Sequence, residues 1–380
     1  MALQIGTAVV DITPRTPCFL AGYAGRDHGH ESVHDPISLR AFYARGSNGD
    51  ALVISADILW FSDAIIEHAL PVLETELGIP SGHVFFIGTH THSAPNVYND
   101  ANKAWAQMVE AQVVAASALA KSRLQDATLF GTTGESKIGI NRREQLPDGK
   151  IILGENPDGP IDREVILVEV RDSAGEAIGR LGNFACHGTM LNQRNYQLSG
   201  DWPGLAASKL EADGGSPFVF LNGGCANIAP RDDRRESFEK VEALSSEFVN
   251  DVKGMVAGLG ALDGDDAIVG AELDIHLPRK LRDVDEGMGK FCKVRIQGLR
   301  IGPLRIIGFP GEVFAQTAMA VKENHPMTMV CSYVAGSRAG YVPVAEAYET
   351  GGYEVRVSPY AEEAEAVLRQ GLLDLLDKLK

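Results

Sequence analysis

HVFFIGTHTHSAPN, residues 83–96, is the most informative stretch of the sequence. A run of apolar residues ends at Gly88, and two histidines, His90 and His92, follow almost directly. A short apolar run bounded by turn residues predicts a buried strand. Residues i and i+2 of an extended chain project to the same side, so both imidazoles can face one site. The pair is consistent with a metal site, a proton-transfer site or two ordinary loop histidines.

Other stretches predict strands because they are rich in β-branched and aromatic residues and end at Gly, Asp or Pro. With the first, they are residues 52–58, 83–89, 163–172, 179–187, 217–223, 268–277, 292–309 and 328–336. Helical spacing of apolar residues predicts the helices, which are residues 62–77, 101–124, 203–213, 234–258, 312–323 and 359–380. Strands and helices mostly alternate, so we expect an α/β fold of mixed β-sheets packed together and flanked by helices. No repeat or linker interrupts the chain, so residues 1–380 are expected to form a single domain.

Three more of the predicted strands run into turns that hold polar groups. One ends at His187, one enters the loop GGCANIAP (223–230), and one precedes Glu312. In α/β sheets, sites gather outside the carboxyl ends of strands. His90, His187 and Glu312 would form a His₂Glu set of the kind that holds catalytic zinc and leaves one position open.

Composition excludes several classes of function. The net charge is −16, which disfavours binding to nucleic acid or to an anionic membrane. No run of residues is long and apolar enough to insert into a membrane, and the start of the chain does not read as a signal peptide. The five cysteines are scattered and form no CxxC motif, so we expect reduced thiols in a cytoplasmic protein. Oligomeric state is open, and an oligomer is compatible with the sequence.

Two known families with an HxH motif fit poorly. A metallo-β-lactamase would carry HxHxDH, but Ser93, Ala94 and Pro95 follow His92. A TIM-barrel amidohydrolase would place HxH on its first strand, and here His90 comes too late in the chain.

An ordered set of motifs resembles the neutral/alkaline, non-lysosomal ceramidases and their shorter bacterial relatives. In chain order the set includes DITP (11–14), LAGYAGR (20–26), VHDPISLRAFY (33–43), IGTHTHSAP (87–95), INRRE (140–144), NFACHGTML (183–191), LSGDWPG (198–204), FLNGGCANIAP (220–230), GFPGEVF (308–314) and AGYVPVAEAYETGGYE (339–354). The resemblance covers most of the chain and implies a ceramidase-type metallohydrolase catalytic domain.

The resemblance implies a zinc ion on four side chains. They are His90, His187, Glu312 and, as a phenol-type ligand, Tyr341. The first three agree with the set inferred from the strand ends, and the family adds the tyrosine.

The resemblance also implies roles for residues beside the metal. His92 is similar to the family residue that contacts the scissile amide, and it could move a proton to the leaving group. Arg142 and Tyr353 match pocket residues that could stabilise a developing oxyanion. Substrate contacts are expected from three further residues, which are Asn141, Asn227 and Asp201.

The chain departs from the family pattern in two respects. Long ceramidases carry a C-terminal immunoglobulin-like domain and a secretion signal, neither of which is expected here. Their GDVSP motif contains a serine with a nucleophilic role, and Ala229 stands at that position. Cys225 lies nearby, but the family offers no base for it.

We therefore expect a zinc-dependent hydrolase that uses zinc-activated water on an amide, with an ester or a lactone as weaker alternatives. The substrate would be a small molecule with an amide or ester carbonyl, smaller and more polar than ceramide. Two other functions remain open: a metal-binding relative without hydrolysis, and a zinc-assisted isomerase or lyase acting on a sugar-like compound.

Overall fold

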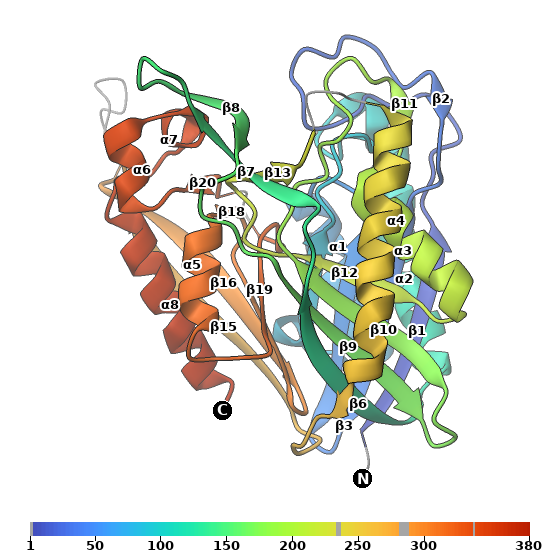
Figure 1. The fold of residues 1–380 in the computed structure, drawn as a ribbon. Helices are drawn as coiled ribbons and strands as arrows, with labels where there is room; N and C mark the ends of the chain where they lie inside the picture. Colours follow the sequence, from blue (N-terminus) through green and yellow to red (C-terminus); the bar gives the residue numbers. More distant parts are fainter. Residues whose placement is uncertain (1–2, 233–236, 281–288, 337–338) are drawn as a thin grey trace.

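The computed structural model describes residues 3–232, 237–280, 289–336 and 339–380, which form four layers (Figure 1). Two β-sheets pack face to face, and helices cover the outer face of each. The helices are α1 (Asp63–Leu77), α2 (Lys103–Ser122), α3 (Asp201–Gly214), α4 (Phe238–Met255), α5 (Ala315–Lys322), α6 (Ala345–Thr350), α7 (Tyr353–Val357) and α8 (Ala364–Lys378). This arrangement confirms the expected fold class of mixed sheets flanked by helices.

The larger sheet has nine strands in the order β12-β10-β9-β6-β1-β3-β4-β5, with β14 added beside β6. Its strands are β1 (Gln4–Asp11), β3 (Ser38–Gly46), β4 (Gly49–Ala56), β5 (Val84–Gly88), β6 (Gln125–Glu135), β9 (Glu164–Asp172), β10 (Ala177–Phe184), β12 (Phe218–Asn222) and β14 (Gly260–Ala261). Both edge strands, β5 and β12, run parallel to their neighbours, because α1 and α3 return the chain to the start of the sheet. The Ser55 hydroxyl of β4 donates to the Phe220 carbonyl of β12 (2.6 Å). The two ends of this sheet therefore lie against each other.

The second sheet has four strands in the order β15-β16-β17-β19. They are β15 (Ile268–Pro278), β16 (Phe291–Ile301), β17 (Leu304–Gly308) and β19 (Thr328–Cys331). The two sheets share one apolar core, in which Phe85 and Val168 of the first meet Leu299 and Ile306 of the second. These side chains are fully buried, and burying a large apolar side chain stabilises the fold by about 1.5–3 kcal/mol.

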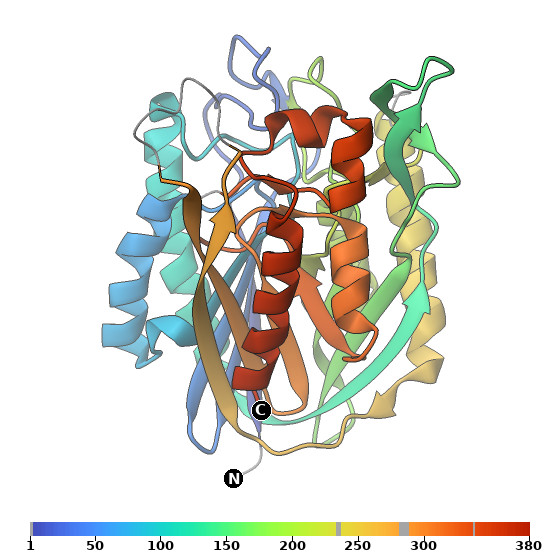
Figure 2. The same cartoon turned by 90° about the vertical axis from the view of Figure 1, so that its left-hand side faces the viewer.

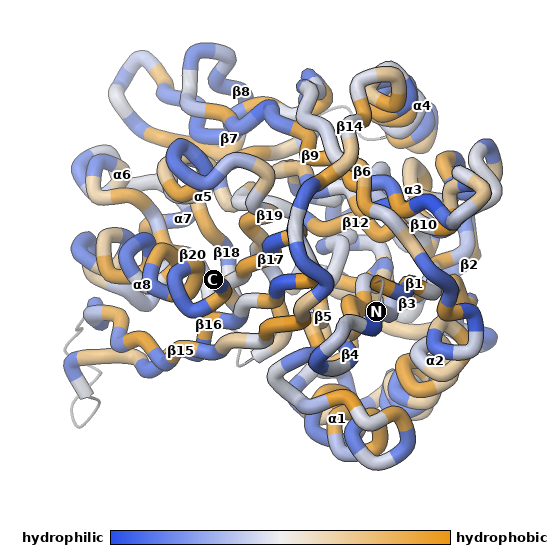
Figure 3. The backbone as a smooth tube through the Cα atoms, turned by 90° about the horizontal axis from the view of Figure 1, so that it is seen from below, coloured by the Kyte–Doolittle hydropathy of each residue, from blue (hydrophilic) through white to orange (hydrophobic). Residues whose placement is uncertain are grey.

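Each outer face is covered by helices with one apolar side. Helices α1 and α2 pack on one part of the larger sheet, α3 and α4 on another, and α5 and α8 on the smaller sheet. Figure 3 shows hydrophilic and hydrophobic residues along α2 and α4, as expected for helices with one buried face. None of the helices in the described part of the chain is long and apolar enough to cross a membrane.

Three small sheets complete the fold. Two of them, β13-β7-β8 and β18-β20, contribute residues to the site described below. A three-stranded sheet joins β13 (Ile228–Pro230), β7 (Gly139–Gln145) and β8 (Ile151–Asn156). A parallel ladder joins β18 (Glu312–Val313) to β20 (Tyr341–Val342), and another joins β2 (Ser32–Val33) to β11 (Gln197–Leu198). The β7–β8 hairpin lies at the end of the molecule opposite both termini (Figures 1 and 2).

Some expected elements differ in extent. The strand expected over 292–309 is two strands, because the chain turns at Gly302, where φ is 55°. The helix expected over 312–323 begins at Ala315, since Glu312 and Val313 pair with β20. The start of the helix expected over 234–258 falls partly outside the described residues. Strands β1, β3, β6, β7 and β8 were not predicted.

Candidate functional site

Three ends of parallel-paired strands bring potential metal ligands together. His90 follows β5, His187 follows β10, and Glu312 follows β17. One ligand atom from each of these buried side chains lies within 4.8 Å of the other two. His187 Nε2 is 3.2 Å from a Glu312 carboxylate oxygen. The structure therefore assembles the His₂Glu set that the strand ends predict.

The backbone orients both imidazoles. His90 Nδ1 lies 3.1 Å from the Leu59 carbonyl, and His187 Nδ1 lies 2.7 Å from the Cys225 carbonyl. Because a carbonyl only accepts, Nδ1 carries the proton in each neutral ring. Nε2 then has a free lone pair, the arrangement found for metal-ligating histidines. This donor set fits a metal ion.

The surroundings shift the pKa values of His90 and His187 in opposite directions. Burial and the neighbouring imidazoles hold the pKa of His90 well below its usual value. Burial and Arg142 also lower the pKa of His187, but interactions with Cys225 and Glu312 outweigh them and raise it to about 9. Metal binding at this cluster would therefore release a proton.

Tyr341 stands beside Glu312 because their strands pair. The two residues are Cα partners in the β18–β20 ladder, which places their side chains next to each other. Burial and the charge of Glu312 raise the pKa of the Tyr341 phenol well above its usual value. A cation would have to offset both effects before Tyr341 could bind as a phenolate.

Tyr333 is a residue of the site that the sequence did not indicate. It follows β19, and its ring stacks on His90 with centroids 3.6 Å apart. Its hydroxyl is 3.4 Å from His187 Nε2 and 3.0 Å from the Cys225 thiol. Both Tyr333 and His90 have a positive φ, 61° and 66°. Such strain costs roughly 1–3 kcal/mol per residue and gathers at functional sites.

His92 lies at the edge of the cluster. Its Nε2 is 3.2 Å from His90 Nε2, and its ring is half-buried. The Arg26 guanidinium donates to the His92 carbonyl, and the ring of Tyr23 packs edge-on against the imidazole. The loop around LAGYAGR (20–26) therefore holds His92 in place.

Arg142 connects the cluster to Tyr353. Its guanidinium lies 3.2 Å from His187 Nε2 and donates to the Tyr341 hydroxyl (3.2 Å) and to the Glu354 carboxylate (2.9 Å). The Tyr341 and Tyr353 rings meet edge to face with centroids 5.7 Å apart. Arg142 thus lies against His187 of the cluster, and Tyr353 reaches the site through its contacts with Tyr341 and Arg142.

The three residues expected to contact substrate are occupied by other parts of the protein. The Asn141 side chain bonds to Arg143 N and the Pro160 carbonyl, and that of Asn227 bonds to Ala315 N and Gln316. The fully buried Asp201 carboxylate accepts from the backbone N–H groups of Met190, Leu191 and Trp202. Their substrate contacts stay a prediction, and these bonds give each a structural task.

Asp201→Asn should change how stability depends on pH. Burial raises the pKa of Asp201 to about 6, above its unfolded value, so the folded protein favours the protonated acid. The protonated Asp201 side chain therefore contributes its full share of the folding stability below about pH 4, and this contribution is lost as pH rises through about 6. We expect the wild type to lose on the order of 2 kcal/mol relative to Asp201→Asn between pH 4.5 and 7. Urea unfolding of both proteins in chelator measures this difference, and a difference independent of pH would contradict it.

The position aligned with the family serine is buried. Ala229 lies on β13 opposite Ile140 of β7 and offers no nucleophilic oxygen. Cys225 is also fully buried, and its thiol contacts the Tyr333 hydroxyl.

Comparison with known proteins identifies the family of this chain. The family model described as neutral/alkaline non-lysosomal ceramidase, N-terminal, matches residues 3–219, more than half of the chain. The chain belongs to this family. The matched segment contains His90, His92, Arg142 and His187, and it ends before Glu312.

Individual members of the family share only about a quarter of their residues with this chain over the aligned segments. It is 27% identical over 250 residues to neutral ceramidase B of Dictyostelium discoideum, a match that spans 58% of this chain and 34% of that protein. It is 26% identical over 243 residues to the neutral ceramidase of Mycobacterium tuberculosis, spanning 57% and 37%. The chain thus spans about a third of the length of these relatives.

The fold likeness extends to the whole chain. The crystal structure of neutral ceramidase from Pseudomonas aeruginosa superposes with a TM-score of 0.82 at 18% identity, covering 100% of this chain and 74% of that one. A ceramidase structure in complex with C2 gives a TM-score of 0.80 over 75% of its chain. The segments that supply Glu312, Tyr341 and Tyr353 therefore belong to the shared fold.

Proposed function

We propose that this ceramidase-family chain is a zinc-dependent hydrolase of an amide bond in a small-molecule substrate, with its metal on His90, His187, Glu312 and Tyr341. The observation that carries the proposal is the buried His₂Glu cluster with both Nε2 atoms oriented by backbone carbonyls. A zinc ion there would supply a Lewis acid that polarises the amide carbonyl and makes a water molecule more acidic.

The residues around the cluster would divide the remaining work. His92 is half-buried at its edge, where Nε2 could donate a proton to the leaving nitrogen. Tyr353 and Arg142 lie where they could hold the carbonyl oxygen as negative charge develops on it. An ion bound to His187 Nε2 would displace the Arg142 guanidinium, which lies 3.2 Å from that atom, and so leave an N–H of Arg142 for substrate. Because Ala229 carries no hydroxyl, water would attack the carbonyl directly.

Metal removal and return test this proposal. We expect about one zinc per chain in protein purified without added metal. Chelation should abolish the release of amine from a panel of N-acyl substrates of increasing chain length, ceramide included. Zinc should restore it, and magnesium, which prefers oxygen ligands, should not. Full zinc occupancy with no amide turnover would contradict the proposal and favour the non-hydrolytic or lyase alternatives.

A further inference from the structure

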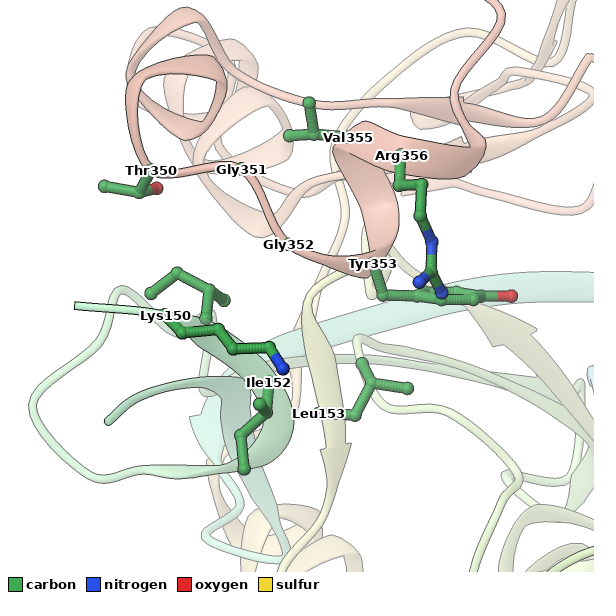
Figure 4. Close-up of a pocket in the computed structure, with 10 residues that line it drawn as sticks. Lys150, Ile152, Leu153, Thr350, Gly351, Gly352, Tyr353, Val355 and Arg356 are labelled. Carbon is green, nitrogen blue, oxygen red and sulfur yellow. The ribbon is translucent and has the colours of Figure 1, made fainter. Parts of the chain in front are cut away.

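A cavity of about 600 Å³ is lined by Tyr353 and lies between two segments of the chain (Figure 4). One wall is the β7–β8 hairpin with Lys150, Ile152 and Leu153. The other is the segment 350–356, which turns from α6 into α7. Tyr353 lines the cavity and also contacts the candidate metal site, because its ring packs against Tyr341 beside Glu312. The rings of Tyr353 and Tyr341 therefore lie between this cavity and Glu312 of the cluster.

The two walls of the cavity are held together by buried contacts. The Arg143 guanidinium on the hairpin donates to the Glu354 carboxylate (2.8 Å) and to the Gly351 carbonyl (2.6 Å) on the opposite wall. Gly352, with φ of 100°, approaches so closely that a Cβ would lie 2.9 Å from both Arg143 and Ile151. The cavity is thus largely formed before any ligand arrives, as small-molecule sites usually are.

The charges of the cavity point to its ligand. Lys150 and Arg356 both line it, both are exposed, and neither forms an ion pair within the described residues. Among the described residues no carboxylate lines the cavity, although the chain carries 51 acidic and 35 basic residues. Figure 4 shows Arg356 above the ring of Tyr353, with its guanidinium carbon 5.8 Å from the ring centroid, and Leu153 below that ring. Lys150 and Arg356 without an ion-pair partner, beside the apolar side chains of Ile152, Leu153 and Val355, suit an anion attached to a short apolar chain.

We propose that this cavity binds a carboxylate on one arm of the amide substrate, so that the substrate is an N-acyl compound with an anionic end. Lys150 and Arg356 bind the anion, the side chains of Ile152, Leu153 and Val355 contact the apolar part of the arm, and Tyr353 lies between this arm and the reacting amide. The inference rests on the proposed function for the reaction, and on the cavity alone for the binding of the anion.

Matched pairs of substrates test the inference. One pair is N-hexanoylglycine and N-hexanoylglycinamide, followed by hexanoate release. The other is N-butylglutaramic acid and its terminal carboxamide, followed by butylamine release. We expect at least one pair to show about a tenfold lower KM for the acid than for the neutral amide. Arg356→Gln and Lys150→Gln should each remove most of that preference by raising KM for the acid toward KM for the neutral amide. Arg356→Lys should retain part of it, and Lys253→Gln, on α4 away from the cavity, should retain all of it.

A binding measurement separates this inference from the proposed reaction. Titration calorimetry of chelated protein with each pair gives dissociation constants without turnover. The same preference for the acid, lost in Arg356→Gln, would support the anion site even if no amide were hydrolysed. Equal affinity for acid and amide in both pairs would overturn it, and so would a preference that survives both the Arg356→Gln and the Lys150→Gln substitution.

Discussion

His187→Ala is expected to abolish both metal binding and turnover. His187 supplies one of three clustered ligand atoms, and the bonds of its Nδ1 to the Cys225 and Ile228 carbonyls orient its Nε2. Metal content should fall from about one ion per chain to less than about a tenth. Amide turnover should fall at least about a thousandfold, because metal polarisation of the carbonyl contributes several kcal/mol to the barrier reduction. Elemental analysis and initial rates on the same preparations measure both effects.

Two further variants keep this result interpretable. His187 is fully buried, so its removal also leaves a void and unpaired backbone carbonyls. Glu312→Gln retains shape and removes only the charge, and it should also lose most of the metal. His68→Ala removes an exposed imidazole paired with Glu110 on the surface, and it should keep full metal and activity. Full metal content with normal turnover in His187→Ala would show that the cluster is not the functional centre.

The convergence of the ligands was predictable because the topology determines it. His90, His187 and Glu312 each follow a buried strand, and parallel pairing brings the carboxyl ends of β5, β10 and β17 to one end of the sheets. Periodicity and turn residues are local signals, and these were present in the sequence. The resemblance then added Tyr341, which the structure places beside Glu312.

The features that were missed depend on contacts between distant segments. β7 carries Asn141, Arg142 and Arg143, and a charged run does not read as a strand. Its arginines are buried only because Glu354, more than 200 residues later, is paired with both. Tyr333 lies inside the stretch predicted as a strand over 328–336, but the strand ends at Cys331 and the left-handed backbone of Tyr333 turns its ring onto His90. No local pattern carries this kind of information.

Gly22→Ala is expected to lower turnover about a hundredfold while leaving the metal in place. Gly22 has φ of 89°, and a Cβ there would lie 2.3 Å from His92 Nδ1 and 2.4 Å from its Cγ. A side chain at this position must push the imidazole away, and a displacement of about 1 Å at a reacting group can cost about a hundredfold in rate. The three atoms nearest to this Cβ all belong to His92, which is not a proposed metal ligand, so metal content should match the wild type. Initial rates and elemental analysis check both results.

Gly175→Ala is the matched control, since its φ of 87° imposes the same backbone strain but no atom lies within 4 Å of the new Cβ. It should lose stability without losing turnover per folded molecule. A double-mutant cycle then identifies the route of the effect. If Gly22 acts by positioning His92, Gly22→Ala should cost little in a His92→Ala background, where no imidazole remains to be displaced. An equal loss in both backgrounds would mean that the loop around Gly22 acts on turnover independently of His92, and the role proposed for that histidine would then lack its structural support.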